Sequence, residues 1–352
     1  PMTECAGQPC RVEQVDGAIQ DGTFPRHISP HQPFFDMRAI TYRIAPDVWA
    51  KTRFDGDVFE MEDQRNWTDA SYKTYCTPLG LPFPVLVREG TCISQSVTLT
   101  LKVESTDASP AQPPTRDDGL ALDDAGVDEL TFSILPSAPR PVPRIGLCVA
   151  SSDQPLNRQE LERLATLNLA HLRVDLDLST ADYASNLRHA AATAHALKVT
   201  LEVALHLSDD AERELAALTK LIGNVKPRVC TWLIFHLAEK STSARWITLA
   251  RDVLGGLDPS AKIGSGTDAF FTELNRERPP VDVMDLVSYS LNPQVHAFDN
   301  ASLVETLEAQ ATTVESARQF CGERPISISP ITLNMRFNPN ATAPESEPPP
   351  GE

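Results

Sequence analysis

The sequence predicts a multidomain protein: part of an antiparallel β-sandwich, followed by an incomplete (β/α)8 barrel of the TIM type. Three observations predict this fold class. Short alternating segments separated by turns fill residues 1–133, which is typical of β-sandwiches. From Arg144 onward, segments with strand and then helix character follow one another, as in repeated βα units. Between these two regions, residues 136–143 are rich in proline and are expected to form a stiff, extended linker.

The first domain is expected over residues 1–135. Its strands are expected near residues 10–15, 35–44, 58–62 and 94–104. Asp16-Gly17 is a turn signal, and Asp55-Gly56-Asp57 is the expected hairpin turn before residues 58–62. In the last of these segments the apolar residues fall at every second position: Val97, Leu99, Leu101 and Val103. Such a period of two places them on one face of a strand.

The barrel is expected over residues 144–340. Its strands are expected to start near residues 145, 171, 199, 229, 261, 284 and 325. No Gly-rich phosphate loop follows the first strand, which favours a barrel over a dinucleotide-binding fold. Helices alternate with the strands, and in the last one Ser302 is the expected cap of an apolar face that consists of Val304, Leu307, Ala311 and Val314.

Seven strands leave a barrel open, because an unclosed sheet keeps two free edges. The eighth strand is therefore expected beyond the last residue, and residues 341–352, rich in Pro and Glu, are expected to be a disordered tail. The first residue is not Met. We therefore expect this chain to be part of a longer protein.

Composition excludes several classes of partner. The 352 residues carry a net charge of −17, which disfavours binding to nucleic acid or to an anionic membrane surface. No segment is apolar and long enough to span a bilayer, and no signal peptide is visible. Seven cysteines occur without a CxxC pair, which indicates reduced thiols in a cytoplasmic protein and argues against a structural zinc site. The oligomeric state stays open.

Barrel enzymes place their active sites where the strands end, at the C-terminal face. Polar residues near the predicted strand ends are Asp177, His206, His236, Asn292, His296 and Arg336. We expect Asp177 and the three histidines to line one cavity. Deeper in the barrel, Arg173 and Glu202 are expected to form an ion pair, because a buried charge needs a partner.

Two absences narrow the chemistry. The chain has no GxSxG motif, which disfavours a serine hydrolase of the α/β type. No Glu ends the fourth or seventh strand, unlike many retaining glycosidases, although Glu239 lies just past the fourth. The three histidines could bind a metal, but their spacing is not diagnostic. We therefore predict no cofactor and leave a divalent metal open.

Residues 59–76 are the most unusual stretch. Glu60 and Glu62 share a strand face, and the residues that follow them include Arg65, Trp67, Tyr72 and Lys73. Carboxylates, a guanidinium and aromatic rings suit a sugar-like ligand, whereas the alternative is a solvated hairpin held by salt bridges. We expect the loop from Glu62 to Lys73 to reach over the barrel cavity as a lid. Arg65→Ala would then reduce turnover and leave the melting temperature unchanged.

Residues 60–75 resemble the signature of the D-apionate lactonase family of bacterial sugar catabolism. Residues 29–34 and 338–342 are also similar to that family. The resemblance implies a β-sandwich, a TIM-like barrel and a further C-terminal β-domain. It also implies hydrolysis of a small-molecule sugar lactone, D-apionolactone, to D-apionate. It supplies no catalytic residue that can be assigned position by position.

Lactone hydrolysis requires a general base for water and hydrogen-bond donors for the oxyanion. The candidate catalytic residues are Glu62, Asp177, His206 and His236. The candidate substrate-binding residues are Arg65, Trp67, Tyr72, Lys73, Asn292, His296 and Arg336. Two alternatives stay open: an enzyme similar to glycoside hydrolases that acts on a glycosidic bond, and a non-catalytic carbohydrate-binding protein.

Overall fold

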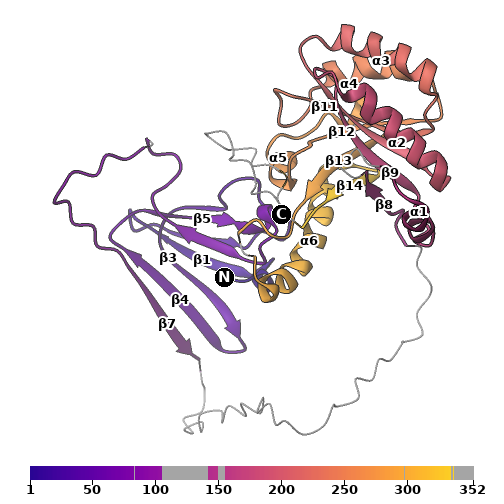
Figure 1. The fold of residues 1–352 in the computed structure, drawn as a ribbon. Coiled ribbons are helices and arrows are strands. Elements are labelled where there is room, and N and C mark those ends of the chain that lie inside the picture. The colour runs from indigo at the N-terminus through magenta and orange to yellow at the C-terminus, as the bar shows by residue number, and fades with distance from the viewer. Residues whose placement is uncertain (83, 105–141, 150–154, 297, 334–335, 337–352) are drawn as a thin grey trace, which may run out of the picture.

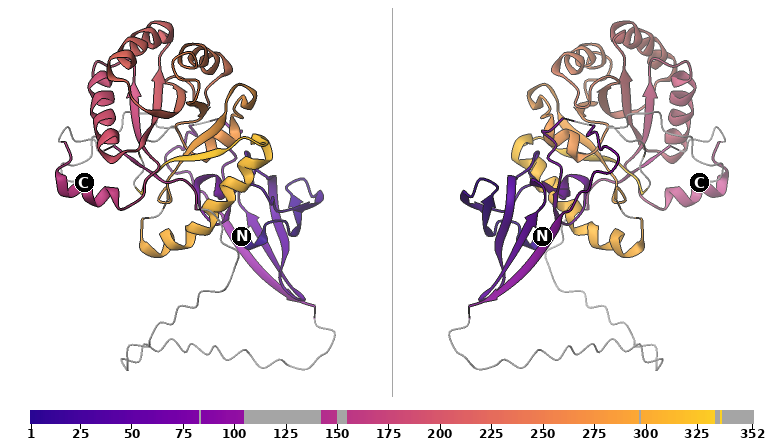
Figure 2. Two further views of the ribbon diagram at one scale, coloured as in Figure 1. Left: turned by 90° about the vertical axis from the view of Figure 1, so that its right-hand side faces the viewer. Right: turned by 90° about the vertical axis from the view of Figure 1, so that its left-hand side faces the viewer.

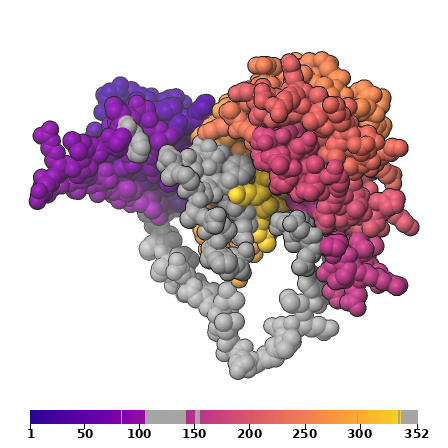
Figure 3. Space-filling view, turned by 45° about the horizontal axis from the view of Figure 1, so that its top comes forward, coloured from indigo at the N-terminus to yellow at the C-terminus, as the bar shows by residue number. Residues whose placement is uncertain are grey.

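The computed structural model describes residues 1–82, 84–104, 142–149, 155–296, 298–333 and 336. They form an N-terminal antiparallel sheet domain and a parallel barrel surrounded by helices (Figure 1). In a space-filling view the sheet domain, indigo to purple, adjoins the barrel, which runs from magenta through orange to yellow (Figure 3). Among the described residues, no helix combines the length and apolarity that crossing a bilayer requires.

The N-terminal domain is one branched sheet of seven strands. The strands are β1 (Pro9–Gln14), β2 (Ile19–Thr23), β3 (Phe34–Ala45), β4 (Val48–Asp55), β5 (Phe59–Asp63), β6 (Tyr72–Tyr75) and β7 (Ser96–Val103). Their order is β2-β1-β3-β4-β7, and β5 pairs with both β3 and β6. The core of this domain includes Phe24, Met37 and Met61, which are almost fully buried. The predicted antiparallel domain is therefore confirmed, as a single sheet in the part that the structure describes.

Strand β7 has the predicted alternation but an exposed face. Val97, Leu99, Leu101 and Val103 pair across from alternate residues of β4 and so share one side of the sheet. Each of them is more than half exposed. Within the described ranges, no other element covers the apolar face of β7.

The barrel contains seven parallel strands at the predicted positions. They are β8 (Gly146–Cys148), β9 (His171–Asp177), β10 (Thr200–Leu207), β11 (Val229–His236), β12 (Lys262–Gly266), β13 (Leu286–Leu291) and β14 (Ile326–Ile331). Each strand pairs with its sequence neighbour, from β8 to β14. The incomplete TIM-like barrel is therefore confirmed, and an eighth strand beyond the chain stays a prediction.

Helices cover the outside of these strands. They are α1 (Arg158–Ala165), α2 (Tyr183–Leu197), α3 (Ala211–Val225), α4 (Ala244–Leu254), α5 (Phe271–Arg276) and α6 (Asn300–Cys321), with short 3-10 helices η1 (Thr3–Cys5), η2 (Gln64–Trp67) and η3 (Val281–Val283). Asn157 and Glu160 form a capping box that starts α1. In α3, the buried residues Leu215, Leu218 and Leu221 recur at helical spacing and face the strands.

Helix α6 departs from the prediction in its cap and in its buried face. Asp299, not Ser302, is the N-cap: its carboxylate accepts a hydrogen bond from the Ser302 N–H. Val304 and Leu307 are exposed, and the buried positions are Thr306, Ala309, Thr313, Ser316, Ala317 and Cys321. The reason is that α6 runs between the barrel and the sheet domain (Figure 2). Small and hydroxyl-bearing side chains there allow close approach and hydrogen bonding, such as that from the Ile28 N–H to Ser316 Oγ at 2.9 Å.

Some predicted boundaries cannot be compared with the structure. The domain end at residue 135, most of the linker at 136–143 and the tail at 341–352 lie outside the described residues. These assignments stay predictions.

Candidate active site

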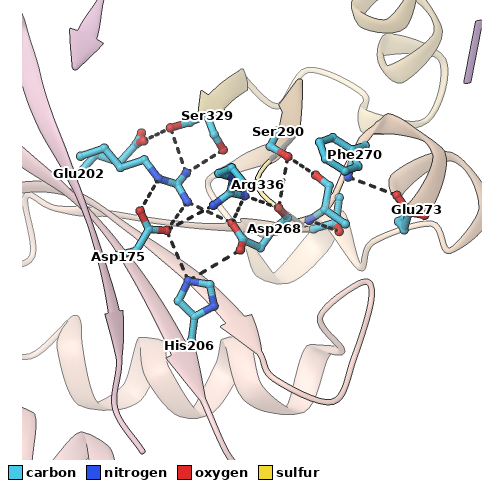
Figure 4. A network of polar contacts seen from close by, with 12 residues as sticks. Asp175, Glu202, His206, Asp268, Phe270, Glu273, Ser290, Ser329 and Arg336 are labelled. Carbon is cyan, nitrogen blue, oxygen red and sulfur yellow. Dashed lines mark hydrogen bonds and ion pairs between the residues drawn. The ribbon is translucent and has the colours of Figure 1, made fainter. Parts of the chain in front are cut away.

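A network of charged side chains fills the C-terminal end of the barrel (Figure 4). Alternate residues of β9 and β10 point inward because strand side chains alternate between two faces. They bring Arg173 and Asp175 from β9, and Glu202 and His206 from β10, into the interior. Asp268 follows β12 and completes the cluster from the opposite side.

Arg173 is the centre of this network. Its guanidinium is 2% exposed and donates to both carboxylate oxygens of Asp175, at 2.6 and 3.2 Å. It also donates to Asp268 Oδ1 at 3.1 Å and to the carbonyl and hydroxyl oxygens of Ser329 at 2.7 and 3.0 Å. The ion pairs of Arg173 are thus with Asp175 and Asp268, and not with Glu202 as predicted. The Glu202 carboxylate instead accepts from the Ser329 hydroxyl, which lies between them.

His206 lies between two carboxylates. Its Nε2 is 3.4 Å from Asp175 Oδ1 and 3.9 Å from Asp268 Oδ2. The imidazole packs beside the Phe235 ring, which belongs to a small apolar cluster inside the barrel with Ala204, Leu233 and Leu286. His206 therefore has an apolar neighbour on one side and acidic groups on another, and its side chain is still 17% exposed.

Arg336 brings a second guanidinium to the same cluster. Its Nη2 donates to the carbonyl oxygen of Asp268 at 2.6 Å and to Asp268 Oδ1 at 2.9 Å. Its Nη1 is 3.9 Å from Asp175 Oδ1. Arg336 is more exposed than Arg173, so a ligand could reach it from solvent.

The electrostatics keep Asp175 ionised. Burial by itself would raise the pKa of this carboxyl, but its contacts with His206 and the Arg173 guanidinium lower it further, to well below its usual range. Asp175 is therefore a carboxylate at neutral pH. It can accept a hydrogen bond from the Nε2–H group of His206. The pair resembles the orienting carboxylate and histidine of many hydrolytic sites.

Three side chains of the network have the spacing of metal ligands. Asp175, His206 and Asp268 each offer a ligand atom, and these atoms lie within 4.8 Å of one another. However, Arg173 and Arg336 already donate to these two carboxylates. A divalent cation would face two guanidinium charges at close range. The donor set therefore fits a metal poorly and suits proton transfer better.

Two strand-end candidates lie apart from this network. Asp177 accepts from the N–H and hydroxyl of Ser179, at 2.9 and 2.6 Å, and so closes a turn. His236 is on the opposite face of β11 from Phe235, where its ring stacks on Trp246 with centroids 4.3 Å apart. The predicted cavity of Asp177 and three histidines is therefore not assembled, because alternation turns His236 toward α4.

His296 and Asn292 instead face the N-terminal domain. His296 Nδ1 is 2.5 Å from Asp69 Oδ2. The carbonyl oxygen of Asn292, a buried residue, accepts from the Thr68 hydroxyl at 3.0 Å. His206, His236 and His296 thus lie in three different environments and offer no common metal site.

Two candidates of the 59–76 stretch, Glu62 and Trp67, lie at the domain boundary, and a third, Lys73, is the strand neighbour of Glu62. Glu62 accepts from Gln64 and has a more distant ion pair with Arg276, at 3.8 Å; burial raises the pKa of Glu62. The Trp67 ring lies under the Arg276 guanidinium, 5.1 Å from its centroid. Lys73 pairs across from Glu62 on β6 and is exposed.

Arg65 and Tyr72 are interior residues of the sheet domain. Arg65 is 1% exposed, donates to both oxygens of Asp63 at 2.8 and 2.7 Å, and also donates to the Pro25 and Arg26 carbonyls. Its guanidinium lies 4.8 Å from the centre of the Tyr72 ring. The Tyr72 hydroxyl also donates to the Pro25 carbonyl. These contacts assign Arg65 and Tyr72 a structural role in place of the predicted substrate contact.

The described contacts of residues 62–69 with the barrel are with α5, α6 and the segment after β13. The stretch thus joins the two domains, and the contacts described for it do not include Asp175, His206 or Asp268. Its predicted role as a lid over the cavity is replaced by one as a domain connector.

Sequence reasoning did not select Asp175 or Asp268 as site residues. The signal for Asp175 is the alternation Arg173, Asp175, Asp177 in β9, which places all three on one face. Residues two positions before the strand end lie inside the barrel, whereas the last residue, Asp177, caps the turn. For Asp268, the signal is its position two residues after the end of β12.

A sheet domain joined to a barrel with a charged cluster at its C-terminal end defines the class of multidomain barrel proteins. Two family models match this chain. That of the D-apionate lactonase N-terminal domain matches residues 1–104, and that of the D-apionate lactonase TIM barrel domain matches residues 145–352. The chain therefore belongs to the D-apionate lactonase family.

Individual relatives were also found. The chain is 33% identical over 350 residues to the D-apionate lactonase of Brucella anthropi, a match that covers 96% of this chain and 55% of that protein. The chain thus spans about half the length of this relative. Among solved structures, β-glucuronidase from Ruminococcus gnavus with uronic deoxynojirimycin has a TM-score of 0.38 and 11% identity, covering 92% of this chain and 48% of that one. D-psicose 3-epimerase from Clostridium cellulolyticum H10 has a TM-score of 0.28 and 13% identity, covering 50% and 70%.

The buried position of Arg65 yields a stability prediction. Arg65→Ala leaves the Asp63 carboxylate buried without its cation, so we expect the free energy of unfolding to fall by about 3–5 kcal/mol. Arg11→Ala is the matched control, since its ion pair with Asp21 is largely exposed, and we expect little change. Urea unfolding monitored by circular dichroism measures both. A stable Arg65→Ala protein with reduced turnover would instead support a direct role of Arg65 at the substrate.

Proposed function

We propose that this chain carries a lactone-hydrolysing site and that its substrate is D-apionolactone, which is opened to D-apionate. Two observations support the proposal: membership of the D-apionate lactonase family, and the His206 imidazole held between two carboxylates at the barrel end. The second observation carries the mechanism. The substrate is then a small molecule that reaches the network from the C-terminal face of the barrel.

In the proposed mechanism His206 is the general base. Asp175 accepts from Nε2 and fixes the ring, so that Nδ1 is left to accept a proton from water as the water oxygen attacks the lactone carbonyl carbon. The bond from that carbon to the ring oxygen then breaks. The proton returns from His206 to this oxygen, which leaves a hydroxyl group and a carboxylic acid, and the acid then loses its proton to solvent as a carboxylate.

Arg336 is the proposed donor to the developing oxyanion. A guanidinium stabilises negative charge best when it is fixed in place before the reaction, and Asp268 holds Arg336 through two hydrogen bonds. Arg173 has its donors committed to Asp175, Asp268 and Ser329. We assign Arg173 the task of holding both carboxylates in position.

A glycosidic reaction is less consistent with this site. A glycosidase needs one carboxyl group that is protonated at working pH, to serve as the general acid. The pKa of Asp175 is lowered instead, and Asp268 accepts from two guanidinium groups. Asp175 is therefore unsuited to the role of general acid in a glycosidase.

The test of the proposal is a paired assay on the purified chain. D-apionolactone and other aldonolactones are followed by acid release, and aryl glycosides are followed by phenol release. We expect acid release from lactones only. Phenol release would support the glycosidic alternative, and binding without turnover would support a carbohydrate-binding protein.

We also propose a cytoplasmic location. All seven cysteines are free thiols, which is the state expected in a reducing compartment.

His206→Gln should reduce kcat for the lactone by about 100-fold or more, the usual contribution of a general base. Glutamine keeps a polar side chain of similar length but cannot take up the proton. His195→Gln is the matched control, because His195 lies exposed in the last turn of α2 and should leave kcat unchanged. Equal rates for wild type and His206→Gln would remove His206 from the mechanism.

Removal of divalent metals should leave lactone turnover unchanged. The reason is that two guanidinium groups already supply the positive charge at Asp175 and Asp268. The measurement is kcat after dialysis against EDTA, with and without added Zn²⁺ or Mn²⁺. Activity that is lost on dialysis and restored by one of these ions would show that Asp175, His206 and Asp268 hold a metal.

A further inference from the structure

The boundary between the two domains is a hydrogen-bonded contact between η2 and α5. Asn66, at η2, is 2% exposed. Its carbonyl oxygen accepts from the Thr272 hydroxyl at 2.7 Å, and its Oδ1 accepts from Asn275 Nδ2 at 3.0 Å. Asn275 Nδ2 also donates to the Ile28 carbonyl at 3.1 Å. Both α5 residues are buried, so these polar groups depend on the N-terminal domain for their partners.

On the N-terminal side, Asn66 is held rigidly. Its Nδ2 donates to the Ser29 carbonyl at 2.7 Å and to the Asp63 carbonyl at 3.1 Å. Asp63 is fixed in turn by the buried ion pair with Arg65 and by the Ser29 N–H. The acceptors that Asn66 presents to α5 are therefore preorganised by the interior of the sheet domain.

On the barrel side, α5 is joined directly to the candidate active site. Asp268 lies three residues before the first residue of α5, Phe271. The segment between them is held against β13, because the Ser290 hydroxyl donates to the Ala269 carbonyl at 2.7 Å and contacts the Asp268 carbonyl at 3.2 Å. Two residues before Asp268, Gly266 has φ +143°, and a Cβ there would lie 2.2 Å from the Ser288 carbonyl oxygen. The segment between Asp268 and α5 is therefore tightly held, and a shift of α5 is expected to move Asp268 as well.

We propose that Thr272 and Asn275 are positioning residues, through which the N-terminal domain sets the place of Asp268 in the active site. They do not touch the reacting groups. They fix α5, and α5 fixes the carboxylate that holds Arg336 and lies beside His206. This inference rests on the proposed lactonase function for its kinetic test. Under this proposal, the 59–76 stretch affects the rate of the reaction through α5 and Asp268, and it does not contact the substrate.

The effect on rate follows from geometry. Catalytic groups must be placed within a fraction of an ångström, and a misplacement of about 1 Å can cost about 100-fold in rate. Loss of the Thr272 hydroxyl leaves the Asn66 carbonyl without this donor inside a buried boundary, so α5 and Asp268 are expected to shift. Substrate binding by other groups is less affected, so kcat should fall more than KM changes.

The kinetic experiment compares three variants of the full chain. Thr272→Val keeps the shape of the side chain and removes the hydroxyl, and we expect kcat to fall by about 10-fold to 100-fold. Thr272→Ser keeps the hydroxyl and should restore kcat. Thr219→Val is the matched control, because the Thr219 hydroxyl donates only within α3, to the Leu215 carbonyl, and kcat should not change.

A second readout is independent of turnover. The imidazole resonance of His206, assigned by its loss in His206→Gln, reports on Asp268 at 3.9 Å. We expect this resonance to move in Thr272→Val and to stay in place in Thr272→Ser and Thr219→Val. If the wild type hydrolyses no lactone, the proposed function fails and the resonance alone decides the positioning claim.

The proposal is overturned if Thr272→Val lowers only the melting temperature and leaves both kcat and the His206 resonance unchanged. If Thr272→Val does not fold, Asn275→Ala is the deciding variant, since it removes both donors of Asn275. The same two readouts apply to it, with the same expected result and the same result against the proposal.

Discussion

The buried guanidinium of Arg173 is the charge around which the barrel interior is built. A cation that is 2% exposed must be compensated by hydrogen-bonded anions, and here Asp175 and Asp268 supply them from opposite sides of the barrel. Ser329 binds the same guanidinium and also donates to Glu202. The placement of the carboxylates on either side of His206 therefore depends on how Arg173 is satisfied.

The N-terminal domain extends this arrangement rather than standing apart from it. The buried Asp63–Arg65 pair fixes η2, and η2 presents Asn66 to α5. A stretch of sequence that looks like a ligand site because of its charges and aromatic rings is used here to join two domains. The charged groups at the barrel end come from β9, from β10, from the segment after β12 and from Arg336.

The sequence predicts the fold well and the site less well, for physical reasons. Alternation and βα rhythm are properties of local residue order, so all seven barrel strands could be predicted. The buried face of α6 could not, because packing against a second domain favours Ala309 and Ser316 over Val304 and Leu307. His206 and Arg336 were predicted from their positions at strand ends, and the structure brings both side chains into one charged network. The predicted surroundings of His236, His296 and Arg65 were wrong. The side of the strand decides the partner of His236, and residues distant in sequence or buried in the sheet domain decide those of His296 and Arg65.

The central claim is that His206 and Asp175 act as one unit in lactone hydrolysis. A double-mutant cycle of His206→Gln and Asp175→Asn, measured as kcat/KM for D-apionolactone, tests it most directly. Residues that act as a unit are strongly non-additive, so the double variant should be about as slow as His206→Gln alone. Additive losses from the two substitutions, or full activity in both single variants, would contradict the account.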